Sequence, residues 1–80
     1  MDRKYKLLKQ YLLNMQMEIG NALENMELLY EDIEHYNDYK DKDYSSSVFT
    51  DLLIIGKNLT RVEEYKENAN ELVNDMMDEM

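Results

Sequence analysis

The chain has 80 residues with 18 acidic and 9 basic side chains, which gives a formal net charge of −9 at pH 7. This length favours one domain and excludes two, and the hydrophobic share of 44% is too high for a disordered chain. Zero cysteines exclude a disulfide framework, a thiolate metal site and a cysteine nucleophile. With no proline, two glycines and few β-branched residues, the composition favours helices over a β-sheet.

The first predicted helix spans residues 3–38. Its apolar residues recur in alternating steps of three and four, which is the heptad spacing of a coiled-coil seam. They are Leu8, Leu12, Met15, Ile19, Ala22, Met26, Leu29, Ile33 and Tyr36. The basic residues that precede this series are followed by an apolar stretch with polar interruptions, so we do not expect a signal peptide.

Residues 39–47 are predicted to form the turn, because they lack apolar periodicity and are rich in Asp and Ser. We expect a hydroxyl of Ser45, Ser46 or Ser47 to cap the helix that follows.

The second predicted helix spans residues 48–79 and repeats the same spacing. Only Lys66 interrupts the apolar character of its series, which consists of Val48, Leu52, Ile55, Leu59, Val62, Lys66, Ala69, Val73, Met76 and Met80. Two helices joined by a short turn are expected to pack antiparallel, with residue i opposite residue 84−i or 85−i. In that register every apolar layer closes, the basic N-terminus lies beside the acidic C-terminus, and Arg61 lies opposite Glu24.

The predicted fold is therefore all-α: a single helical-hairpin domain over residues 1–80, built as an antiparallel two-helix coiled coil. About a dozen apolar residues lie outside the seam, and so small a hairpin has little interior of its own. We expect it to bury a second face by dimerising into a four-helix bundle.

No residue pattern indicates catalysis, a metal or a cofactor. His35 is the only histidine, and Asp32-x-x-His35 is a poor match to the paired Glu-x-x-His motifs of di-iron bundles. Asp41-x-Asp43-x-Ser45 lacks the glycine and the glutamate that complete a calcium loop. The sequence predicts a protein that is not an enzyme and binds no cofactor.

Acidic stripes and exposed aromatic residues are the candidate partner-binding groups. Acidic residues keep near-heptad spacing on both helices and flank the turn, and tyrosine is frequent in binding surfaces. The predicted site consists of Glu24, Glu27, Tyr30, Glu31, Glu34, Asp38, Tyr39, Asp41, Asp43, Tyr44, Phe49, Glu67, Glu71, Asp75 and Asp78.

Three functional hypotheses follow, with a non-enzymatic module that binds and modulates a partner protein as the first. The second is a phage or mobile-element inhibitor whose acidic stripes mimic nucleic acid in a basic groove. The third is a small exported helical hairpin or its partner. The acid excess argues against direct nucleic-acid binding, and the longest apolar run, residues 52–55, argues against a membrane span. We expect a homodimer in the cytoplasm of a bacterial or phage-infected cell.

Overall fold

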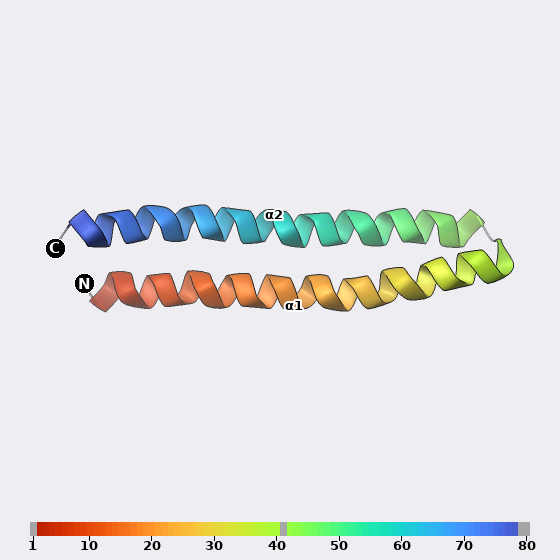
Figure 1. Cartoon of the computed structure of the whole chain (residues 1–80), viewed down its shortest axis with the longest axis horizontal. Helices are drawn as coiled ribbons and strands as arrows, with labels where there is room; N and C mark the ends of the chain where they lie inside the picture. Colours follow the sequence, from red (N-terminus) through yellow and green to blue (C-terminus); the bar gives the residue numbers. More distant parts are fainter. Residues whose placement is uncertain (1, 41, 79–80) are drawn as a thin grey trace.

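The computed structural model describes residues 2–40 and 42–78, except for the side chains of residues 42–44. This part of the chain forms two α-helices, α1 over Asp2–Tyr39 and α2 over Lys42–Asp78, and no strand. The helices lie side by side along their whole length, with the N- and C-terminal ends at the same end of the molecule (Figure 1). The predicted all-α helical hairpin is confirmed.

The connection between the helices is shorter than the predicted turn over residues 39–47. Helix α1 includes Tyr39 and α2 begins at Lys42, so the serines expected to cap α2 lie inside it. The predicted start at residue 48 was wrong because serine weakens a helix without breaking it. Neither proline nor glycine occurs between residues 21 and 55, so no strong helix breaker stands near the reversal.

Helix α1 ends at a residue in the left-handed conformation. Lys40 has a φ of 54°, and its backbone N–H donates a hydrogen bond of 2.7 Å to the carbonyl oxygen of Tyr36. This is the left-handed cap that often ends helices, formed here without glycine. The Lys40 ammonium also lies 5.5 Å from the centre of the Tyr36 ring, which adds a cation–π contact.

The seam between the helices keeps heptad spacing, but it uses only half of the predicted residues. The ones found buried or half-buried are Leu8, Met15, Ala22, Leu29, Val48, Ile55, Val62, Ala69, Val73 and Met76. Most of the other predicted seam residues are exposed: Leu12, Ile19, Met26, Ile33, Leu52, Leu59 and Lys66. Each helix is therefore rotated about its axis relative to the prediction.

A second series of mostly polar residues completes the seam in their place. Its members are Tyr11, Glu18, Asn25, Asp32, Asp51, Asn58, Tyr65 and Leu72. Asn25 meets Asn58, and one heptad further Asp32 meets Asp51, so residue i faces residue 83−i. This register lies one or two residues from the predicted one. The rotation has a physical reason, because facing polar side chains can bond one another across the seam.

The rotation makes the two faces of the hairpin unequal. The residues one and four positions after each apolar seam residue lie together on one side of their helix. In an antiparallel pair, equivalent positions of the two helices emerge on the same face. One face, here called the apolar face, therefore carries exposed Tyr5, Leu12, Ile19, Leu23, Met26, Tyr30, Ile33, Phe49, Leu52, Leu59 and Met77.

Candidate interaction surfaces

The apolar face contains two open grooves in the half of the hairpin next to the turn. The groove on α1 is lined by Leu23, Met26, Glu27, Tyr30 and Glu31. The groove on α2 is lined by Phe49, Leu52, Leu53, Gly56, Lys57 and Thr60. Because residue i faces residue 83−i, residues 23–31 of α1 lie at the level of residues 52–60 of α2. The two grooves therefore flank the apolar face at the same height.

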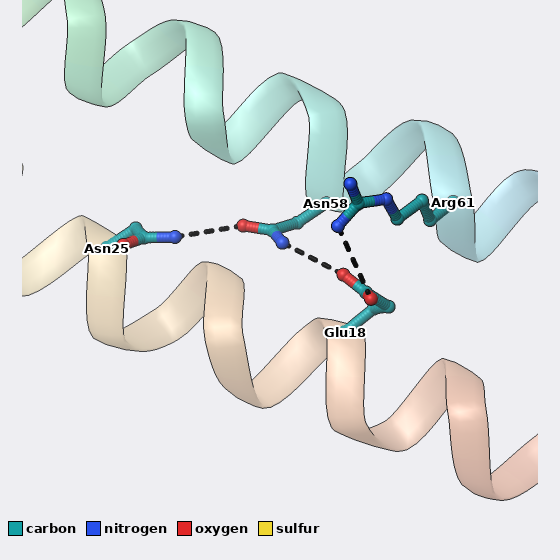
Figure 2. A network of polar contacts seen from close by, with 4 residues as sticks. All are labelled: Glu18, Asn25, Asn58 and Arg61. Carbon is teal, nitrogen blue, oxygen red and sulfur yellow. Dashed lines mark hydrogen bonds and ion pairs between the residues drawn. The ribbon is translucent and has the colours of Figure 1, made fainter.

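The seam itself holds a buried polar network that joins the helices (Figure 2). Asn58 donates a 2.9 Å hydrogen bond to Oε2 of Glu18 and accepts one of 3.0 Å from the Asn25 amide. The Arg61 guanidinium lies 3.7 Å from Oε1 of Glu18, not beside Glu24 as the sequence predicted. Glu18 and Asn58 are only 8% and 5% exposed, so these partners are what makes burial of the carboxylate tolerable.

A pair of carboxyl groups, Asp32 and Asp51, faces across the seam one heptad closer to the turn. Oδ2 of Asp51 is buried, and no donor in the described part of the hairpin forms a hydrogen bond to it. A hydrogen bond to Asp32, partial burial and the negative charge of Asp32 together raise the pKa of Asp51 above its ordinary value of 3.8.

Replacing Asp51 by Asn is expected to stabilise the hairpin at neutral pH. A raised pKa means that the carboxyl pair stabilises the fold in acid and loses this contribution as the pH rises through the pKa of Asp51. An amide donates to Asp32 at any pH, so the melting temperature at pH 7 should rise by about 2–4 °C and at pH 3 should hardly change. Thermal melts of Asp51→Asn across this range test it.

Asp75→Asn is the matched control for that experiment, because it removes the same charge from an exposed position of α2. An equal gain at pH 7 in both variants would mean that only the net charge matters, and the interaction between Asp32 and Asp51 would be excluded as the cause.

The predicted acidic stripes lie at opposite ends of the hairpin. Glu24, Glu27, Glu31, Glu34 and Asp38 are exposed along the outer part of α1 near the turn. Glu67, Glu71, Asp75 and Asp78 are exposed on α2 near the chain ends. The structure therefore presents two separate acidic patches, and it does not bring the stripes together into one surface.

The predicted aromatic contacts are divided between two places. Tyr30 and Phe49 belong to the apolar face, while Tyr39 stacks on His35 at the turn with ring centres 6.0 Å apart. A hydrogen bond to Glu34, followed by the charge of Glu34 and partial burial, raises the pKa of Tyr30. Asp41 and the side chains of Asp43 and Tyr44 lie outside the described residues, so their predicted roles stay predictions.

Neither a metal site nor a membrane span stands out in the structure. Among the side chains of residues 2–40 and 45–78, no three His, Asp or Glu residues gather where they could hold a metal ion. Neither α1 nor α2, as far as the structure describes them, has an apolar stretch long enough to cross a bilayer.

Two features were not predicted from the sequence: the polar residues in the seam and the apolar face that results from them. A sequence signal for both was present. Glu18, Asn25 and Asp32 repeat every seven residues, as do Asp51 and Asn58. An antiparallel register that pairs Asn with Asn and Asp with Asp would have found the polar seam. It would also have left almost every second member of each apolar series on the surface.

Fold and surfaces together define an acidic all-α helical hairpin with one apolar face. Comparison of the chain with known protein families, curated proteins and solved structures finds no match.

Proposed function

We propose that this protein is a non-enzymatic interaction module that forms a homodimer through its apolar face and presents its acidic patches to a partner protein. The observation that carries the proposal is the inequality of the two faces. Large apolar side chains from both helices gather on one face, where nothing in the described part of the hairpin covers them. Contiguous apolar surface of this kind marks sites of association with other proteins.

The direction of the apolar stripes supports a four-helix bundle. On each helix the predicted apolar stripe and the observed seam share one heptad position, and their second positions are adjacent in the sequence. The centre of the stripe is therefore rotated by about 50° about the helix axis from the centre of the seam. A helix that packs against one other helix directs its apolar stripe at that helix. A helix in a square bundle of four directs it between two neighbours, about 45° from each. These stripes have the angle that a bundle requires.

The size of the apolar face fits a second copy of this chain as the occupant. The hairpin measures 61 Å by 14 Å between its outer Cα atoms, an area of about 850 Å² seen face-on. A stable protein interface buries roughly 800 Å² on each partner. A second hairpin has the same length and the same apolar face, so it covers this surface from end to end.

Sedimentation equilibrium of the native chain tests the dimer. At 10–50 μM, roughly the range where a standard interface of this size should be occupied, we expect the mass of two chains. A chain that sediments as a monomer throughout this range would contradict the proposed homodimer.

Nucleic-acid mimicry is the second candidate function, and the acidic patch on α1 is the observation that favours it. Its exposed carboxylates, from Glu24 to Asp38, extend over about 21 Å of helix. Glu24, Glu34 and Asp38 line neither groove of the apolar face, so they would remain accessible in a dimer formed by that face. Mimicry requires that DNA or RNA displace the bound partner and that added salt weaken binding steeply, whereas partner binding through the turn aromatics requires neither.

A further inference from the structure

Two two-fold arrangements would pair the apolar faces of two hairpins. With the axis along the hairpin, both turns lie at the same end and α1 of each copy covers α2 of the other. With the axis across the hairpin, the turns lie at opposite ends and each helix covers its own equivalent. We infer that the dimer takes the same-end arrangement, in which α1 of each copy fills the groove at Gly56 of the other. This inference rests on the proposed homodimer.

The two grooves lie at the same height along the hairpin, and this favours the same-end arrangement. A two-fold axis along the hairpin leaves every residue at its own height. The α1 groove of one copy, residues 23–31, then meets the α2 groove of the other, around residues 52–60. The same contact occurs twice in the dimer. The protruding Leu23, Met26 and Tyr30 are thereby placed against the side of α2 that lacks a side chain at Gly56.

Gly56 leaves real space for such a contact. A Cβ atom added at this position would meet nothing within 4 Å, so the hairpin itself gives no packing reason for glycine inside α2. Glycine within a helix is less stable than alanine, because it loses more backbone freedom on folding. A close approach by another chain supplies the missing reason.

The opposite-end arrangement makes a poorer contact with the same groove. It would bring the α2 groove over the part of the partner's α2 that carries Lys66 and Asn70 on the apolar face, and both residues are exposed in the hairpin. Phe49, Leu52 and Gly56 would then be covered by a charge and an amide. In the same-end arrangement Lys66 instead faces the level of Gln16 on α1, where a polar neighbour is available.

Charge at the groove rims agrees with the same-end arrangement. Lys57 stands at the rim of the α2 groove, and Glu27 and Glu31 stand at the rim of the α1 groove. A same-end dimer brings Lys57 of each copy to the level of the two acids of the other. Exposed pairs of this kind add little affinity, but they favour one arrangement over another.

A pair of glycine variants tests the groove. Gly20 is also inside a helix and also has open space where a Cβ atom would stand, but it lies on the outer edge of α1, away from the apolar face. Both Gly56→Gln and Gly20→Gln should stabilise the helices of the hairpin to a similar degree. Sedimentation equilibrium should show dimerisation weakened at least tenfold by Gly56→Gln relative to Gly20→Gln, because the dimer contains the groove twice.

The distance between two spin labels tests the orientation. The chain has no cysteine, so Ser46→Cys at an exposed position near the turn gives one label per copy. Pulsed electron paramagnetic resonance should give about 25–30 Å between labels in a same-end dimer and above ~50 Å in an opposite-end dimer, given the helix rise and interhelical spacing.

The outcomes separate this inference from the proposed function. A native chain that stays monomeric overturns both. A dimer with the longer label distance, or one that Gly56→Gln and Gly20→Gln affect equally, overturns the same-end arrangement and leaves the homodimer standing.

Discussion

Leu59→Gln is expected to weaken the proposed dimer strongly while leaving the hairpin folded. Leu59 lies on the apolar face and is 51% exposed in the hairpin. The proposed dimer would bury most of this exposed surface. Fully burying a leucine side chain stabilises by about 1.5–3 kcal/mol, so the exposed half of Leu59 accounts for about half of this, and the proposed dimer contains two copies of the residue. The loss of about 1.5–3 kcal/mol should raise the dissociation constant roughly 10- to 150-fold.

Leu28→Gln is the matched control for this experiment. Leu28 is the same residue type with the same exposed fraction of 51%, but it lies on the opposite face of the hairpin. Leucine and glutamine have similar helix propensities, so neither change should reduce the helical circular dichroism of the hairpin much. Leu28→Gln should alter the dissociation constant less than about threefold. Equal weakening by both variants would show that the apolar face is not where the copies meet.

The helical hairpin could be predicted from the sequence because two periodic signals agreed. Both helices carry a heptad pattern of apolar residues that only Lys66 interrupts, and the register that closed their apolar layers also paired opposite charges near the chain ends. The boundary at the turn could not be predicted equally well. It depends on a left-handed residue at Lys40, and lysine carries no sequence signal for that conformation.

The rotation of the helices was missed because the seam was placed by the apolar pattern alone, without the heptad repeat of Glu18, Asn25 and Asp32. In a four-helix bundle the stripe on each helix points between two neighbours, so it overestimates the contact with either one. Residues such as Ile19 and Met26 were therefore assigned to the seam of the hairpin, where the structure has Glu18 and Asn25. The acidic residues of the predicted site were found exposed, but exposure follows from charge alone and does not test their role.

The buried network provides the second large effect, because Asn58 bonds two partners that have little access to water. We expect Asn58→Leu to destabilise the hairpin by about 2–4 kcal/mol. The change removes the only amide that donates to Oε2 of Glu18 in the described network, and it leaves the Asn25 amide without its acceptor. Arg61 offers weak compensation, since its side chain is 56% exposed and screened by water. Chemical denaturation followed by circular dichroism, at one fixed protein concentration, measures the loss.

Asn74→Leu, an identical change at an exposed position of α2, should shift the free energy of unfolding by less than about 0.5 kcal/mol. The triple variant Glu18→Leu, Asn25→Leu and Asn58→Leu should recover the stability that Asn58→Leu loses, because it leaves neither the carboxylate of Glu18 nor the amide of Asn25 unpaired. The triple variant should be less specific in its register. Three apolar side chains no longer favour the register that sets residue 25 against residue 58, so amide NMR spectra should show more than one set of peaks. If Asn58→Leu is instead as stable as the native chain, the network holds neither the fold nor its register.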